Sequence, residues 1–335
     1  MNTAVVAGFS MRHEAPFSPT ELRLIQIIEA GLGITAPIWF YALFFPTDYG
    51  YGRGLLLGLL LICGNLFLVL RMTKADACLR RILPTAYLAK LAAAGVYLYA
   101  VQHLFNGGDL LGYHDYATQH ADTFLATHEW WRAGLGVNTE FILSVVTALY
   151  IIAGSSITFG IVLFATLAFW GEFLIYRACC ISLRSLNRGR AALLLLMFPS
   201  IVFWSAAIGK EALLYLATGL IAYGIARLTY APTPLVAVSM GLGFLLAAFV
   251  RPHVAALLAV SITATYFFTR NANGTIGIVL KIISIPLLVY GSYYAFQQAT
   301  QFLNAESVSQ GMHAIQKVSH NSAYGGSATD RKSVV

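Results

Sequence analysis

Charged residues are scarce in this chain. Asp, Glu, Lys and Arg make up 10% of its 335 residues, while hydrophobic residues make up 58%, and the mean hydropathy is +0.71. A soluble globular domain carries about 25% charged residues, so the composition excludes that class. Apolar runs of about twenty residues recur, each long enough to cross a bilayer as a helix. We therefore expect an all-α, polytopic transmembrane helical bundle.

Other features that the sequence lacks exclude further classes of protein and of site. The alternating segments of about ten residues that are typical of a membrane β-barrel are missing. The four cysteines, Cys63, Cys78, Cys179 and Cys180, show neither metal-ligand spacing nor a disulfide pattern. Residues 1–23 contain no apolar stretch of the kind found in a cleavable signal peptide. The net charge of +7 is spread over several short loops, so nucleic acid is not an expected partner.

The basic loops predict the orientation in the membrane. Segments 71–81 and 177–190 are rich in Arg and Lys, with one acid in the first and none in the second. Short loops of this kind face the cytoplasm. Residues 1–23 are then a cytoplasmic N-terminal segment, and the polar tail 297–335 is extracytoplasmic. The tail stops without a closing helix, which leaves open that the chain is part of a longer protein.

The transmembrane domain, residues 24–296, is expected to contain about nine spans. They cover approximately 24–45, 54–70, 84–105, 157–176, 191–206, 211–226, 234–250, 253–270 and 275–296.

The apolar run 141–153 is too short for a full span and ends at Gly154-Ser155-Ser156. We interpret it as a re-entrant or juxtamembrane helix. Two tight crossings over 141–176 are the alternative, but they would place the four arginines of 177–190 outside.

Polar residues gather in one long stretch, residues 106–140, which this topology makes the first extracytoplasmic loop. Its carboxylates are Asp109, Asp115, Asp122, Glu129 and Glu140. A merely solvated connection is the plain alternative to a functional site. No spacing among these acids requires a metal, and no cofactor is expected, although a divalent cation is not ruled out.

Two tight turns place further charges on the same predicted face. One contains Lys210 and Glu211, and the other contains Arg251 and His253. Each set could serve only as a helix cap or a helix end. Their position opposite the same acidic stretch favours a joint site. Another acid, Glu172, is expected to pair with Arg177 one turn later in its own helix.

The order of these features resembles a known family. A long external stretch with Asp precedes an apolar segment broken by Gly-Ser-Ser, then the hairpin FPSIVFWSAAIGKEALLYL, then a hairpin with Arg-Pro. This layout, over roughly residues 80–270, is similar to bacterial polytopic membrane glycosyltransferases of the GT-C type, which use lipid-phosphate-linked sugars and include mannosyltransferase-like proteins. The stretch begins with GGD, whereas a tandem acidic pair is common in the family.

The resemblance implies a role for each candidate residue. Asp109 or Asp115 would be the catalytic base, with His114 beside it, and Glu211 would be a second acid. Lys210 and Arg251 would bind the phosphate of the donor, with His253 also in the substrate site. The expected partners are a polyprenyl-phosphate-linked sugar, membrane lipids, and a glycan, lipid or protein acceptor at the outer face of the bacterial plasma (inner) membrane.

This chemistry needs a carboxylate to accept the acceptor proton and cations to stabilise the departing phosphate. A polysaccharide polymerase or ligase is the alternative enzyme class. A transporter or a non-enzymatic membrane protein ranks third, since no inverted repeat is evident and the charges lie at helix ends.

Overall fold

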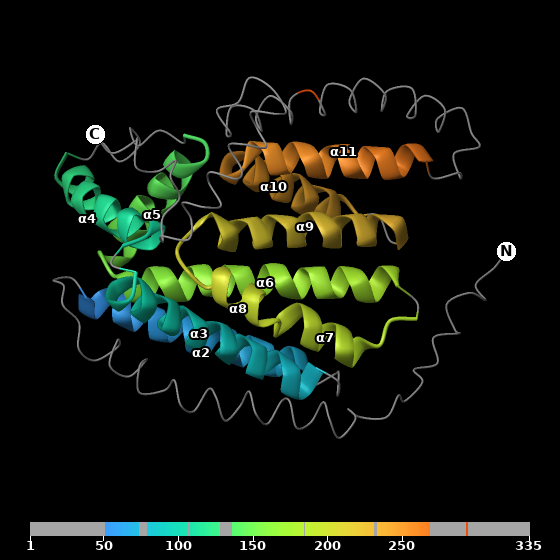
Figure 1. Ribbon diagram of the computed structural model, residues 1–335, viewed down its shortest axis with the longest axis horizontal. Coiled ribbons are helices and arrows are strands. Elements are labelled where there is room, and N and C mark those ends of the chain that lie inside the picture. Colours follow the sequence, from blue (N-terminus) through green and yellow to red (C-terminus); the bar gives the residue numbers. More distant parts are fainter. Residues whose placement is uncertain are drawn as a thin grey trace.

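The computed structural model describes residues 51–73, 79–105, 107–127, 136–183, 185–230 and 233–268, together with Tyr293. Within these ranges all regular structure is helical and no strand occurs, which confirms the all-α class for this part of the chain. In chain order the helices are α2 (Tyr51–Thr73), α3 (Leu79–His103), α4 (Asp109–Thr127), α5 (Thr139–Ala153), α6 (Ile157–Ser182), α7 (Arg188–Leu196), α8 (Pro199–Trp204), α9 (Lys210–Tyr230), α10 (Pro234–Val250) and α11 (Pro252–Phe268) (Figure 1). The expected terminal segments 1–23 and 297–335 and the expected span 24–45 lie outside the described residues, as does 275–296 apart from Tyr293.

The described ranges contain helices that could span a membrane. Four of them, α2, α3, α6 and α9, are long and apolar enough to cross a membrane. Helices α5, α10 and α11 are apolar but shorter, at 15, 17 and 17 residues. The total of about nine spans therefore stays a prediction.

The long helices share one bundle axis, with α2, α6, α9 and α11 running in one direction and α3 and α10 in the other (Figure 1). The end of α2, the start of α3 and the α6–α7 connection, which belong to the two basic segments, lie at one end. The α3–α4, α8–α9 and α10–α11 connections lie at the other end, where the candidate site residues are found. The arginine-rich connections and the candidate site therefore lie at opposite ends of the bundle.

Helices α6 and α9 run parallel and in close contact through glycine. A Cβ added at Gly171 of α6 would lie 2.5 Å from the backbone nitrogen of Leu216 in α9, and one added at Gly219 would overlap the backbone of Gly171. Nearer the start of both helices, a Cβ at Gly160 would lie 2.7 Å from Cδ1 of Ile208. Small residues of this kind let helix backbones approach closely in membrane proteins.

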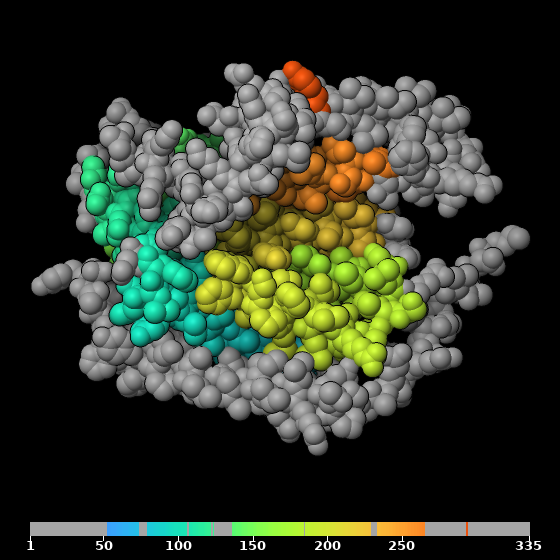
Figure 2. All heavy atoms as spheres, in the orientation of Figure 1, coloured from blue at the N-terminus to red at the C-terminus, as the bar shows by residue number. Residues whose placement is uncertain are grey.

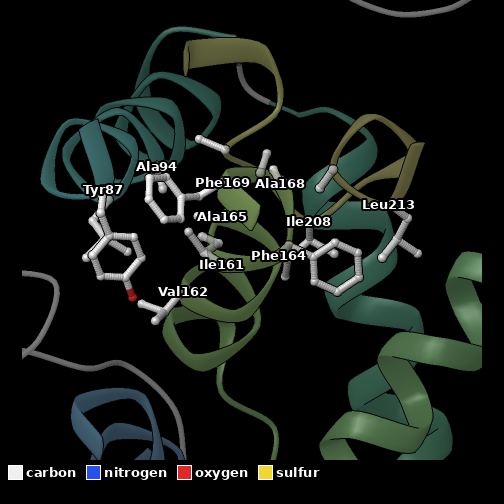
Figure 3. Close-up of a cluster of buried hydrophobic side chains, with 14 of the residues drawn as sticks. Tyr87, Ala94, Ile161, Val162, Phe164, Ala165, Ala168, Phe169, Ile208 and Leu213 are labelled. Atoms are coloured by element: carbon white, nitrogen blue, oxygen red, sulfur yellow. The ribbon is translucent and has the colours of Figure 1, made fainter. Parts of the chain in front are cut away.

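The core surrounds α6 and contains residues from distant parts of the chain (Figure 3). Tyr87 and Ala94 come from α3, Phe164 and Phe169 from α6, and Ile208 from the turn before α9. The rings of Tyr87 and Phe169 lie 5.1 Å apart between centroids. Since α6 contacts both α3 and α9, it fixes how the two halves of the bundle meet.

Over the expected span 191–206 the chain forms two short helices, α7 and α8, where one helix was expected. Phe198 adopts an extended conformation (φ −64°, ψ 119°) before Pro199, as proline requires of the residue before it. Pro199 also lacks the N–H that a continuous helix would need. Leu194, Phe198 and Trp204 of this broken segment are exposed, and α7 and α8 contribute to the surface seen in Figure 2.

The stretch 106–140 is also not a simple loop. Residues 109–127 form α4, preceded by Gly107 and Gly108 with φ of 143° and 155°, a region that side chains beyond glycine rarely adopt. Leu110, Tyr113, His114, Ala117 and Ala121 are all buried, at the spacing of one helix face. That face packs on α5.

Two other helices have bounds that differ from the sequence-based expectation, and a third agrees with it. Helix α3 begins at Leu79, so Pro84 lies inside it, at the sixth position, where proline cannot donate the usual hydrogen bond to the carbonyl oxygen of Arg80. Helix α6 continues to Ser182, beyond the expected end at Tyr176. Helix α5 confirms a short helix over the expected 141–153, ended by Gly154 at φ 86°.

Candidate functional site

The α8–α9 turn presents Lys210 and Glu211 at the start of α9. The five residues before them, 205–209, are buried although they are not helical. Helix α9 begins directly at Lys210, with Glu211 in its first turn, where a carboxylate interacts favourably with the helix dipole. The Lys210 ammonium donates a hydrogen bond to Oγ1 of Thr139, at 2.7 Å.

The α10–α11 hairpin brings Arg251 and His253 to the same place. Pro252 starts α11 directly after Arg251, so the two helices turn without a loop. The Arg251 guanidinium forms an ion pair with Oε1 of Glu211, across 40 positions of sequence. The structure therefore brings Arg251 to Glu211, which is adjacent to Lys210 in the sequence.

The N-terminus of α5 forms a third side of this group. The backbone N–H of Asn138 donates to the carbonyl oxygen of Phe249, at 2.7 Å, and the rings of Phe141 and Phe249 stack at 5.1 Å. Asn138 has a positive φ of 63°, which asparagine tolerates better than most residues. Sequence reasoning missed Asn138 and Thr139, although Asn-Thr-Glu before an apolar run is a helix-start signal.

His253 lies in the first turn of α11, outside the four candidate spans. Burial lowers the pKa of this imidazole below its usual value, and the positive charges of Arg251 and Lys210 lower the pKa further. Near neutral pH the uncharged imidazole is therefore favoured. It can accept a proton or a hydrogen bond beside the two cations.

Asp109 and Asp115 occupy different sides of α4. Both are exposed, but six residues at about 100° each place them about 120° apart around the helix. Asp109 lies in the first turn of α4, directly after the end of α3, whereas Asp115 lies in the middle of α4 on its exposed side. The two candidate bases therefore differ in position along the helix as well as around it.

His114 is part of the contact between α4 and α5. It is 8% exposed, and its Nδ1 lies 2.8 Å from the hydroxyl of Tyr150. This hydrogen bond and the edge-on contact of the two rings give His114 a packing role in the described structure.

Replacing Tyr150 by phenylalanine is expected to destabilise the protein by about 1 kcal/mol, because a buried hydrogen bond to His114 is lost. Thermal unfolding in detergent should show a melting temperature a few degrees lower. The exposed Tyr116 of α4 provides the matched control, since Tyr116→Phe should change stability by less than about 0.5 kcal/mol. Equal effects of the two substitutions would contradict the packing role.

Within the described residues, no group of three or more His, Cys, Asp or Glu side chains is placed to hold a metal ion. Glu129 lies outside those residues. The described acids lie on different helices or on different turns of one helix, so they do not form a set of ligands for a metal ion.

Glu172 does not pair with Arg177, and that expectation is wrong. Its Oε1 lies 2.5 Å from Nζ of Lys90 in α3, and both side chains are buried, at 2% and 1% exposure. Arg177 is exposed at the far end of α6. Sequence reasoning missed Lys90, although an ionisable residue inside an apolar span is a signal that calls for a partner.

Ser205 completes this buried cluster. Its hydroxyl lies 2.9 Å from Oε1 of Glu172 and 2.5 Å from Nζ of Lys90. Nζ of Lys90 also donates to the carbonyl oxygens of Ile201 and Val202 in α8, at 3.2 and 3.4 Å. We call Lys90, Glu172 and Ser205 the buried polar cluster. It joins α3, α6 and the end of α8.

Comparisons with protein-family models, with curated proteins and with solved structures give no match to this chain. Function is therefore inferred from the chain's own residues.

Proposed function

We propose that the protein is a membrane glycosyltransferase that moves a sugar from a polyprenyl-phosphate-linked donor to an acceptor of the cell envelope. The observation that supports this most directly is the meeting of Lys210, Glu211 and Arg251 at one end of the bundle. Two cations and a carboxylate beside apolar helices suit a ligand with a phosphate head and a lipid tail. In the proposed orientation this end is extracytoplasmic, because the arginine-rich connections at the other end face the cytoplasm.

Each residue has a defined task in the proposed reaction. Arg251 and Lys210 bind the phosphate, Arg by two parallel hydrogen bonds and Lys as a point charge. A carboxylate, Asp109 or Glu211, takes the proton of the acceptor hydroxyl. The acceptor oxygen then bonds to the anomeric carbon as the bond from that carbon to the phosphate oxygen breaks, and the lipid phosphate leaves.

The ion pair between Glu211 and Arg251 fits this scheme. Both side chains are partly exposed, at 46% and 34%, so solvent screens the pair and it contributes only about 0.2–1 kcal/mol to stability. A phosphate can therefore compete for the guanidinium at small cost. Release from Arg251 would leave the Glu211 carboxylate available to accept a proton.

Replacing Arg251 by alanine is expected to lower sugar transfer by about 10²–10³-fold, because a cation that stabilises the developing phosphate charge is lost. The melting temperature should change little, since the ion pair is partly exposed. Transfer is measured with purified protein in nanodiscs and a radiolabelled polyprenyl-phosphate sugar, and binding of polyprenyl phosphate alone is measured in parallel.

Arg177→Ala is the matched control. It removes an exposed arginine from the opposite end of the bundle and should leave both transfer and binding unchanged. Full activity of Arg251→Ala, or equal losses in the two variants, would reject the proposed site.

A further inference from the structure

The buried polar cluster does more than join three helices. A buried ion pair is weak evidence of stabilisation, because apolar residues of similar size often do as well. Here one carboxylate oxygen, Oε2 of Glu172, is buried without a hydrogen-bond partner in the described residues. Leaving such an atom unpaired is costly, so stability alone gives no reason for this arrangement.

The contacts of Lys90 show what the cluster holds. Helix α8 has only six residues and ends at Trp204. The backbone N–H of Ser205 donates to the carbonyl oxygen of Ile201, at 3.3 Å, but the last carbonyl oxygens of so short a helix have few other backbone donors. Lys90 places its ammonium on two of them, those of Ile201 and Val202. Ser205, the residue after the helix, shares the same ammonium. Lys90 thus caps α8 from another helix.

The cluster fixes one end of the turn that leads to the candidate site. Residues 205–209 are buried and non-helical, and irregular backbone at membrane depth occurs only where protein or a water-filled cavity surrounds it. At the other end of the turn, Ile208 packs against Gly160 of α6. Lys210 and Glu211 follow at once. Any shift of the turn therefore moves both side chains relative to Thr139 and Arg251.

We propose that Lys90, Glu172 and Ser205 are positioning residues, which hold the α8–α9 turn so that Lys210 and Glu211 face Arg251. Their role in catalysis rests on the proposed function; their role in holding the turn does not. A displacement of about 1 Å in a binding group can reduce activity 10²-fold, so loosening the turn is expected to weaken phosphate binding without touching the phosphate.

The test separates holding the turn from simple packing. The double variant Lys90→Met/Glu172→Leu removes both charges together, so no buried charge is left unpaired, and its melting temperature should stay within about 5 °C of the wild type. Hydrogen exchange measured by mass spectrometry should nevertheless show amides of residues 201–211 exchanging about tenfold faster or more. Affinity for polyprenyl phosphate should fall about tenfold through the displaced cations.

If residues 201–211 of the double variant exchange at the wild-type rate, the proposal is overturned. Apolar side chains would then replace the cluster without loosening the turn, which is the result expected of a cluster that only packs. If the double variant does not fold, Ser205→Ala serves instead: it removes one hydroxyl, leaves both charges paired, and should still speed exchange at 201–211. If Arg251→Ala binds polyprenyl phosphate as tightly as the wild type, the proposed function fails, while the exchange result still decides whether the cluster holds the turn.

Discussion

Replacing Gly171 by leucine is expected to prevent the bundle from assembling. The new Cβ would lie 2.5 Å from the backbone nitrogen of Leu216 and nearer still to the carbonyl carbon of Tyr215. These are backbone atoms inside α9, so no side chain can rotate away, and the two helices must separate. Overpacking a core costs about 1–3 kcal/mol even where side chains can adjust. A larger loss is expected here, because the entire α6–α9 contact is displaced.

Size-exclusion chromatography and thermal unfolding of purified protein measure this effect. Gly64→Leu, in the candidate span α2, is the matched control, because nothing lies within 4 Å of a Cβ added there. The control should elute and unfold like the wild type, and Gly171→Leu should aggregate or unfold at a much lower temperature. A normal elution profile and an unchanged melting temperature for Gly171→Leu would show that α6 and α9 are not in such close contact.

Replacing Lys90 alone by methionine is expected to cost about 3–5 kcal/mol. The substitution leaves the Glu172 carboxylate buried without a counter-charge, and removing one member of a buried pair has this typical cost. The carbonyl oxygens of Ile201 and Val202 lose the lysine donor as well. Reversible unfolding in mixed detergent micelles, or the melting temperature where unfolding is irreversible, measures the loss.

Lys210→Met makes the same chemical change at a partly exposed position and should cost at most about 1 kcal/mol. Adding Glu172→Leu to Lys90→Met should recover most of the lost stability. If Lys90→Met and Lys210→Met unfold alike, the ammonium of Lys90 does not neutralise a buried carboxylate.

Local signals in the sequence predicted several elements well. The expected span 234–250 matches α10, because Thr233-Pro234 starts the helix and Arg251-Pro252 ends it. The start of α6 was likewise predicted, since Ser156 caps it by accepting from the N–H of Phe159. Proline and the capping residues act within one turn of the chain, so sequence alone reveals them.

Two elements were missed for different reasons. Helix α4 was predicted as a loop because its acids and histidines suggested solvent, although its apolar residues recur at helical spacing. The pair Lys90–Glu172 joins residues 82 positions apart, and no local pattern specifies which two spans come together. For the candidate site, the sequence predicted only that its residues lie on the same side of the membrane. The contacts of Arg251 with Glu211 and of Lys210 with Thr139 depend on how α5, α9 and α10 pack.

The parallel contact of α6 and α9 has an electrical consequence. Antiparallel neighbours place opposite dipole ends side by side, whereas Gly160 against Ile208 and Gly171 against Leu216 show these two helices starting at the same end. Their positive dipole ends, each equivalent to about half an elementary charge, therefore add beside Lys210. This part of the local field comes from backbone peptide groups. It does not titrate, and no side-chain substitution that preserves the two helices removes it.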